Sequence, residues 1–168
     1  MKGLWEKQFG EDENHIEIPR EIVQSQCEIL ANMTNEKIIG RITVYDGDVK
    51  SYTINPIRFA LNSPFIEKSF DIQSVLGEVD EDKIIAYEFY LSSLKTPKYR
   101  YRAFIIYHSI MIYPVNFIIE RSIADELEMP EEVSASNAEE FRGILGKILN
   151  SEKITNIINS LLVLNKDY

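Results

Sequence analysis

The chain has 168 residues, 45% of them hydrophobic, and this apolar content excludes an intrinsically disordered protein. A chain of this length suits one domain, which can bury a hydrophobic core without a stabilising disulfide or metal ion. Its 27 acidic and 18 basic residues give a formal net charge of −9. That charge opposes sequence-independent binding to nucleic acid, because such binding needs cationic contacts to phosphate.

Targeting signals are absent from the sequence. The N-terminal residues contain no apolar segment of signal-peptide length. The longest stretch without a charged residue, 103–119, is shorter than the roughly 20 apolar residues of a membrane-spanning helix. Its isoleucine and aromatic residues favour strands instead. We therefore expect a cytoplasmic protein that does not enter a membrane.

Residues 1–15 form an acidic N-terminal segment that we expect to be partly ordered at most. The segment carries three large apolar side chains, Leu4, Trp5 and Phe9. These side chains either dock onto the body of the protein or engage another protein. The body itself, residues 16–168, is expected to be a single domain.

The first predicted element is a helix over 19–35. Pro19 suits the first helical turn, where its missing N–H would have no partner, and Asn35 suits a left-handed residue that ends the helix. Apolar residues recur every three or four positions and place Cys27 on the buried face. We interpret Cys27 as a core thiol rather than a nucleophile, because no base is evident beside it.

A β-hairpin is predicted next, with strands over 38–45 and 49–54. Asp46 and Gly47 between them supply the residue pair that favours a type I′ turn. Acidic residues flanking so tight a turn lack the spacing of a calcium-binding loop, so no metal role is expected for them. Residues 55–82 have no clear pattern beyond a short helix suggested over 64–76.

Three further strands are predicted over 84–94, 99–110 and 112–119. Alternation along the middle strand places Arg100, Arg102 and His108 on one face. Pro114 lies inside the last of these strands and favours an edge position or a bulge there, because proline cannot donate to the sheet.

The C-terminal part reads as an acidic connector over 120–135 followed by two helices. Ser136 and Glu139 form a predicted capping box, and an apolar stripe follows, fails at 150–152 and then resumes. The sequence therefore predicts an α+β fold in a single domain. A mostly antiparallel sheet of about five strands is covered by an N-terminal helix and a C-terminal helical pair.

No motif in the sequence identifies a reaction. Ser109 follows His108 directly, but neighbours in a strand point to opposite faces and cannot form a catalytic pair. The sequence contains neither a phosphate-binding loop nor Cys and His residues at metal-ligand spacing, so no cofactor or metal is expected. A hydrolase that uses two carboxylates stays open, although paired carboxylates carry little information in a chain with 27 acids.

One group of residues, which we call the basic cluster, concentrates positive charge and aromatic rings in this acidic chain. Its members are Lys95, Lys98, Tyr99, Arg100, Tyr101, Arg102 and His108. Two guanidinium groups on one face of a strand could hold a carboxylate or phosphate, and thus an anionic ligand or an acidic partner. The structural alternative is a ladder of charges that faces acids such as Glu88 on the neighbouring strand.

The composition favours a non-enzymatic cytoplasmic bacterial protein that acts by binding another macromolecule. A protein partner fits better than nucleic acid, and an immunity- or inhibitor-type protein that neutralises a basic partner is one form of this prediction. The alternative is a small anionic-ligand-binding protein or minor enzyme that uses the Arg100/Arg102 face. A buried pocket lined by the basic cluster would favour the alternative, and a flat or convex acidic face would favour the first prediction.

Overall fold

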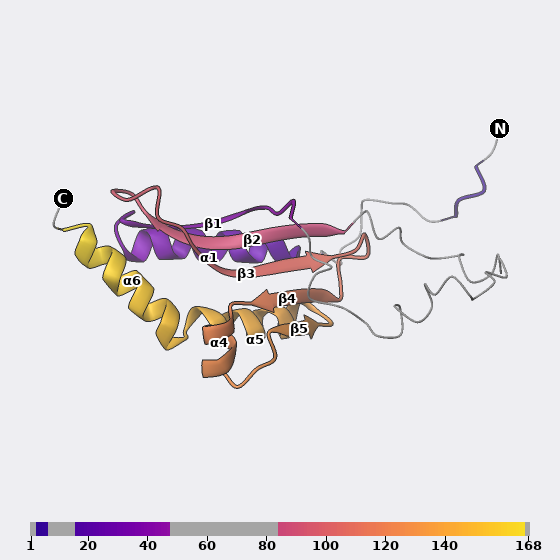
Figure 1. Ribbon diagram of the computed structural model, residues 1–168. Helices are drawn as coiled ribbons and strands as arrows, with labels where there is room; N and C mark the ends of the chain where they lie inside the picture. The colour runs from indigo at the N-terminus through magenta and orange to yellow at the C-terminus, as the bar shows by residue number, and fades with distance from the viewer. Residues whose placement is uncertain (1–2, 7–15, 48–83, 167–168) are drawn as a thin grey trace, which may run out of the picture.

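The computed structural model describes residues 3–6, 16–47 and 84–166. Residues 16–47 and 84–166 form one α+β domain with a five-stranded antiparallel sheet (Figure 1). Neighbouring strands are consecutive in the chain, in the order β1-β2-β3-β4-β5. The strands are β1 (Ile38–Val44), β2 (Ile85–Ser93), β3 (Tyr101–His108), β4 (Val115–Ile119) and β5 (Glu132–Ala135). The helices are α1 (Pro19–Met33), α4 (Arg121–Glu126), α5 (Ala138–Leu149) and α6 (Glu152–Leu164). The predicted fold class is therefore confirmed, and none of these described helices is long and apolar enough to cross a bilayer.

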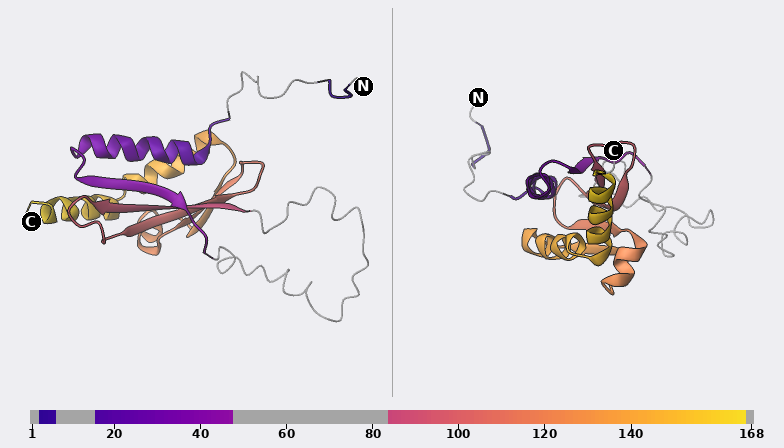
Figure 2. Two further views of the ribbon diagram at one scale, coloured as in Figure 1. Left: turned by 90° about the horizontal axis from the view of Figure 1, so that it is seen from above. Right: turned by 90° about the vertical axis from the view of Figure 1, so that its left-hand side faces the viewer.

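The hydrophobic core lies between the sheet and the helices α1 and α5 (Figure 2). A row of phenylalanine rings runs through it from β2 to α5. The rings of Phe89 and Phe104 stack with centroids 4.9 Å apart, and Phe117 meets Phe104 edge-on at 5.6 Å. Phe141 of α5 stacks on Phe117 at 4.8 Å. This aromatic packing holds α5 against the sheet. We call the face of the sheet that carries these rings the core face.

Helix α1 begins and ends close to the predicted positions. Pro19 lies in its first turn, and Asn35 just beyond it has a φ of 50°, as a left-handed helix end requires. Cys27 of α1 is buried, and desolvation raises the pKa of its thiol to about 11, so the interpretation as a core thiol is confirmed. A Cβ on Gly40 of β1 would lie 3.2 Å from the Cys27 sulfur, so the absent side chain at position 40 lets α1 approach the sheet.

The predicted hairpin turn at Asp46-Gly47 is wrong. Neither Asp46 nor Gly47 has the positive φ that a type I′ turn requires of both residues. Strand β1 pairs with β2, much further along the chain, from Ile38 opposite Ser93 to Val44 opposite Tyr87. β1 is an edge strand of the sheet, so β2 covers one of its two edges. The predicted strand over 49–54 and helix over 64–76 lie outside the described residues.

Two predictions about the segment from 112 to 135 are also wrong. Pro114 does not interrupt a strand, because β4 begins directly after it, and β4 is not an edge strand, since it pairs with both β3 and β5. The proline therefore lies where no sheet hydrogen bond is lost. The acidic connector expected over 120–135 folds into α4 and the edge strand β5.

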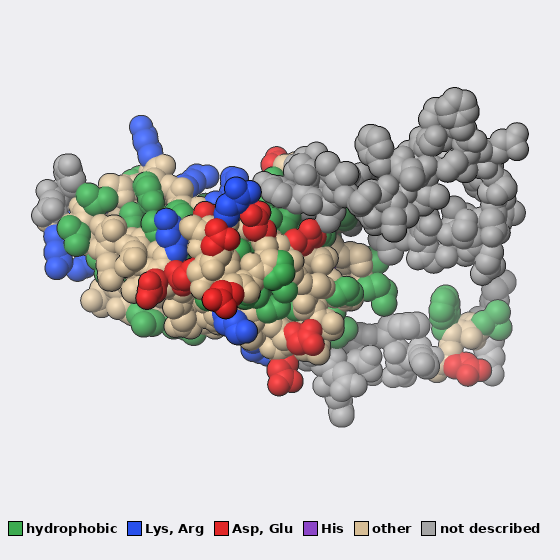
Figure 3. Space-filling view, turned by 60° about the horizontal axis from the view of Figure 1, so that its bottom comes forward, with side chains coloured by type: hydrophobic (Ala, Val, Ile, Leu, Met, Phe, Trp, Pro, Cys, Tyr) green, Lys and Arg blue, Asp and Glu red, His purple; other side chains and the backbone are tan. Residues whose placement is uncertain are grey.

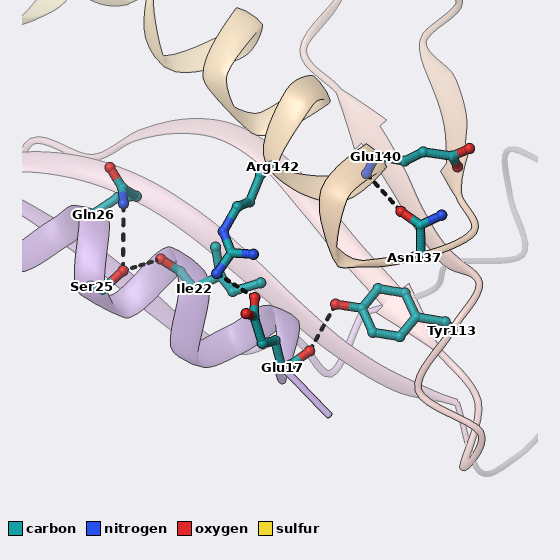
Figure 4. Close-up of polar contacts among 8 residues, drawn as sticks. All are labelled: Glu17, Ile22, Ser25, Gln26, Tyr113, Asn137, Glu140 and Arg142. Atoms are coloured by element: carbon teal, nitrogen blue, oxygen red, sulfur yellow. Dashed lines mark hydrogen bonds and ion pairs between the residues drawn. The ribbon is translucent and has the colours of Figure 1, made fainter. Parts of the chain in front are cut away.

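The C-terminal helical pair is confirmed, with a different capping residue. Helices α5 and α6 are separated at residues 150–151, where the apolar stripe fails. The cap of α5 is Asn137 rather than Ser136: the Asn137 side chain accepts a hydrogen bond from the Glu140 amide at 2.9 Å (Figure 4). The Glu140 carboxylate accepts one from the Ser136 amide at 2.7 Å, so the predicted box is shifted by one residue.

The chain entering α1 is fastened to the rest of the domain at Glu17. The Glu17 carboxylate forms an ion pair with Arg142 of α5. The Tyr113 hydroxyl, from the β3–β4 connection, donates a hydrogen bond to the Glu17 carbonyl at 2.7 Å (Figure 4). These contacts join three segments that are distant in sequence and fix the point at which the N-terminal segment leaves the domain.

The described part of the N-terminal segment does not pack onto the domain. Leu4 is 96% exposed and Trp5 is 83% exposed. Residues 3–6 lie away from the sheet and helices in both views of Figure 2. Of the two alternatives for these apolar side chains, the exposure of Leu4 and Trp5 disfavours docking onto the described part of the domain, and Phe9 lies outside the described residues.

Candidate functional site

The basic cluster starts in the turn between β2 and β3 and continues into β3. Lys95 and Lys98 are exposed in the turn, and Tyr99 and Arg100 are exposed in the approach to β3. Tyr101, Arg102 and His108 belong to the strand itself. The structure therefore brings most of the predicted cluster to one end of the sheet, with His108 at the far end of β3.

A β-bulge at Ala103 divides the cluster between the two faces of the sheet. Phe89 of β2 is opposite Phe104, whereas the next residue, Tyr90, is opposite Arg102, so Ala103 is the extra residue. Directly opposite residues share a face. Arg102 therefore lies on the outer face, the one opposite the core face, and His108 lies with Phe104 on the core face. The prediction that Arg102 and His108 share a face is wrong, because strict alternation cannot reveal an inserted residue.

His108 is a buried residue at the edge of the core. It is 5% exposed, and its Nδ1 lies 2.7 Å from the carbonyl oxygen of Ser109. Its ring is tilted against Tyr87, with centroids 6.5 Å apart. His108 thus takes no part in the surface that carries the arginines.

Arg102 makes the contact that the structural alternative expects, and Arg100 contacts an aromatic ring instead of an acid. Arg102 Nε lies 2.6 Å from Glu88 Oε2, and the Glu88 side chain is only 15% exposed. The Arg102 guanidinium also lies 5.9 Å from the centroid of the Tyr45 ring. Arg100 is 5.0 Å from the centroid of Tyr90. A carboxylate and two aromatic rings therefore already contact the charges that an anionic ligand would use.

A hollow of about 330 Å³ lies beside Arg102 on the outer face. Its floor is apolar and includes Ile105 and Ile118. Its polar lining has both signs of charge, since Arg121 Nε lies 2.8 Å from Glu131 Oε1. Among the described residues of the basic cluster, Arg102 is the one that lines this hollow. A pocket that favours anion binding would be lined by several residues of the basic cluster, and this hollow is lined by one of them.

Glu120, at the edge of the hollow, holds α4 onto β3. Its carboxylate accepts hydrogen bonds from the Tyr101 hydroxyl at 3.1 Å and the Ile123 amide at 3.2 Å, and Ser122 contacts it as well. Burial alone would raise the pKa of Glu120, but these hydrogen bonds outweigh it and hold the pKa below its ordinary value. Burial and the neighbouring carboxylate raise the pKa of Tyr101. The pair is therefore a structural anchor in which the carboxylate stays ionised.

The segment 120–140 carries the densest negative charge of the described residues, on α4, β5 and the first turn of α5. We call this surface the acidic face. It contains eight carboxylates and one arginine, Arg121; the acids are Glu120, Asp125, Glu126, Glu128, Glu131, Glu132, Glu139 and Glu140. Asp and Glu side chains gather over α4, β5 and α5 in the space-filling view (Figure 3).

Several acids of the acidic face have structural partners, and others do not. Glu126 accepts hydrogen bonds from the amides of Glu152 and Lys153 at 2.9 and 3.0 Å and so caps α6. By contrast, the exposed residues Asp125, Glu128 and Glu139 form no side-chain hydrogen bond or ion pair with another described residue. The sequence signalled the charge of this segment but not its structure, because α4 and β5 are too short to show a period.

Comparisons with known proteins identify no family for this chain. No model of a known protein family, no curated protein and no solved structure matches the chain. Within residues 3–6, 16–47 and 84–166, no group of three or more His, Cys, Asp or Glu side chains could hold a metal ion.

Proposed function

We propose that the protein is non-enzymatic and acts by binding a basic protein partner through the acidic face. The observation that carries this proposal is the concentration of eight carboxylates and one arginine over residues 120–140. Five of these carboxylates lie on α4, β5 and α5, and the other three, Glu120, Glu128 and Glu131, lie next to α4 or β5. An immunity- or inhibitor-type protein that neutralises a basic partner in the bacterial cytoplasm has this property. Nucleic acid is disfavoured as a partner, because the net charge of −9 repels phosphate.

The physical argument is electrostatic steering by a preorganised surface. Complementary charges raise association rates by about 10–10³-fold at low ionic strength. The acidic face is rigidly held, because Glu126 caps α6 and Glu120 anchors α4 to β3. Carboxylates that are already in place lose little conformational entropy when a partner binds.

A second candidate is an anionic ligand or acidic partner held by the basic cluster. The hollow beside Arg102 favours it, since the hollow adjoins the Arg102 side chain, which is 58% exposed. Such a ligand would have to compete with Glu88 for Arg102, whereas Lys98 and Arg100 remain exposed nearby.

The test is affinity capture from the cytosol of the source cells, with three charge variants compared by mass spectrometry. The first variant, Asp125→Lys/Glu128→Lys, changes exposed acids of the acidic face and spares those that cap or pair. The matched control, Glu21→Lys/Glu28→Lys, makes the same change in net charge on α1, which lies on a different side of the molecule (Figure 2). The third variant, Lys98→Glu/Arg100→Glu, reverses exposed charges of the basic cluster. Thermal unfolding verifies that each variant is folded.

We expect the wild-type protein and the α1 control to retain the same basic protein and the first variant to lose it. Equal retention by the first variant and the control would contradict the acidic face as the binding surface. Loss with the third variant alone would instead support the basic cluster.

A further inference from the structure

A groove between α1 and α6 exposes apolar surface over the core face of the sheet. We call it the α1–α6 groove. It has a volume of about 200 Å³, and none of the described residues that line it is charged. Leu30 and Met33 of α1 line one side, and Ile158 of α6 lines the other. Met33 is 77% exposed, so apolar surface continues from the groove onto its rim. An apolar cavity of roughly 150 Å³ can hold a benzene ring, so this groove has room for a large apolar side chain.

The C-terminal ends of α1 and α6 lie at one end of the domain, together with the start of β1 and the end of β2 (Figure 1). The Ile38 amide donates a hydrogen bond at 3.2 Å to the side chain of Thr34, the C-terminal cap of α1. The Ser93 hydroxyl donates one at 3.3 Å to the side chain of Asn165, which caps α6. Ile38 and Ser93 are opposite each other in the sheet. Large apolar side chains are exposed at this end of the domain, and they are Met33, Leu94, Val163 and Leu164.

The same end carries positive charge, although the chain is acidic overall. We call it the basic end, and it consists of residues 33–37, 93–98 and 163–166. These residues include four lysines and one acid, Glu36. The C-terminal ends of two helices contribute roughly half a negative charge each, so the basic end remains positive. Lys37 and Lys166 are exposed and form no ion pair with another described residue, so their charges are not neutralised by a neighbour.

Lys166 lies in line with the α1–α6 groove. It follows Ile158 and Leu162 at intervals of four residues, and residues so spaced lie on the same side of a helix. Ile158 lines the groove, and Lys166 is roughly 12 Å further along the helix axis. Lys37 lies beside the exposed Leu94, whose amide donates a hydrogen bond to the Lys37 carbonyl at 3.1 Å. A ligand in the groove therefore has apolar surface at one point and lysines about two helical turns beyond it.

We propose that the α1–α6 groove binds an amphipathic helix of a partner protein that carries acidic residues beside its apolar face. Apolar side chains three or four positions apart enter the groove, as in other complexes in which a helix occupies a groove. Carboxylates about two turns further along the bound helix pair with Lys37 and Lys166. A second copy of the chain is disfavoured as the occupant, because each copy has a net charge of −9 and the two repel one another. The groove is separate from the acidic face, so the inference does not rest on the proposed function.

The test uses the full chain and two synthetic helical peptides with the same leucine face. The acidic peptide has glutamate at its polar positions, and the basic peptide has lysine there. Binding is measured by fluorescence polarisation of the labelled peptides. Met33→Glu places a charge on the rim of the groove. Its matched control is Met111→Glu, because Met111 is 73% exposed and lies in the β3–β4 connection, outside the groove.

A second pair of variants tests the lysines. Lys37→Glu/Lys166→Glu reverses two charges of the basic end. Arg41→Glu/Lys147→Glu makes the same change in net charge at exposed positions that belong neither to the groove nor to the basic end. Thermal unfolding verifies that all four variants are folded.

We expect the wild type to bind the acidic peptide at least roughly tenfold more tightly than the basic peptide. Met33→Glu should weaken binding of the acidic peptide by roughly tenfold, and Met111→Glu should leave it unchanged. Lys37→Glu/Lys166→Glu should reverse the preference between the two peptides, which a loss of folding cannot do. Arg41→Glu/Lys147→Glu should keep the wild-type preference.

Four results would overturn the proposal. One is equal or absent binding of the two peptides by the wild type. Another is an equal effect of the two lysine-site and control variants, which would reduce the preference to net charge. Sedimentation that shows self-association of the wild type, lost in Met33→Glu, would assign the groove to a second copy. Retention of the protein by phosphatidylglycerol vesicles but not by the acidic peptide would assign the basic end to a lipid surface.

Discussion

Arg102 and Glu88 contact one another on the outer face of the sheet, and the Glu88 side chain is largely buried there. Arg102→Glu would place two carboxylates together in this half-buried site. We expect this change to lower the free energy of unfolding by on the order of 1–2 kcal/mol, between the values for exposed and buried pairs. The double variant Glu88→Arg/Arg102→Glu should recover part of the loss, as measured by urea denaturation. Equal stability of the single variant and the wild type would show that the ion pair contributes nothing.

Gly40 gives a second prediction at the scale of single residues. An added Cβ would lie 3.2 Å from Cys27 Sγ and 3.3 Å from Phe89 Cε2, closer than ordinary packing allows. The crowding in Gly40→Ala should therefore be relieved when Cys27→Ala removes the sulfur. We expect a coupling energy of about 1 kcal/mol in a double-mutant cycle of unfolding free energies. Strictly additive effects would indicate that α1 moves away from the sheet without cost.

Among the elements, α4 depends on the ionised form of Glu120. The pKa of Glu120 is lower in the folded protein than its ordinary value of 4.5. Its contribution to stability is therefore complete above pH 4.5 and is lost as the pH falls through the lower folded value. Glu120→Gln should be less stable than the wild type at pH 7, and the difference should shrink as the pH falls below 4.5 and through the lower folded pKa. Thermal unfolding at a series of pH values measures this, and a constant difference would be inconsistent with the anchor.

The elements that the sequence predicts well are those with several turns or alternations. Helices α5 and α6 repeat their apolar stripe often enough to reveal even the break at residues 150–151. Short elements such as α4 and β5 have no such repeat. The Asp46-Gly47 turn was suggested by the local preference of this residue pair alone, and neither residue has the positive φ that the turn requires.

The same reasoning explains what could be predicted about the candidate site. A contact between Arg102 and Glu88 could be anticipated from charges on neighbouring strands, and the structure has it. The placement of His108 and Arg102 on opposite faces could not be predicted. It depends on a β-bulge, in which Ala103 is one extra residue of β3 relative to β2. The sequence indicated that residues 120–140 are rich in acids. It did not indicate the shape of the acidic face, because that shape depends on how α4, β5 and α5 pack together.

On the scale of the whole molecule, negative charge and apolar surface are separated. The acidic face lies on α4, β5 and the start of α5. The α1–α6 groove, lined by Leu30, Met33 and Ile158, lies over another part of the domain. A basic partner bound to the acidic face would therefore leave this groove uncovered.

The association rate constant of the purified basic partner tests the proposed function most directly. It is measured by stopped-flow mixing at low and at physiological salt concentration, for the wild type and for Asp125→Lys/Glu128→Lys. Steering by the acidic face predicts a wild-type rate that falls steeply with salt, and a variant rate roughly tenfold lower at low salt. The difference should narrow at physiological salt because the charges are screened. Equal rates for the two proteins at low salt would contradict binding through the acidic face.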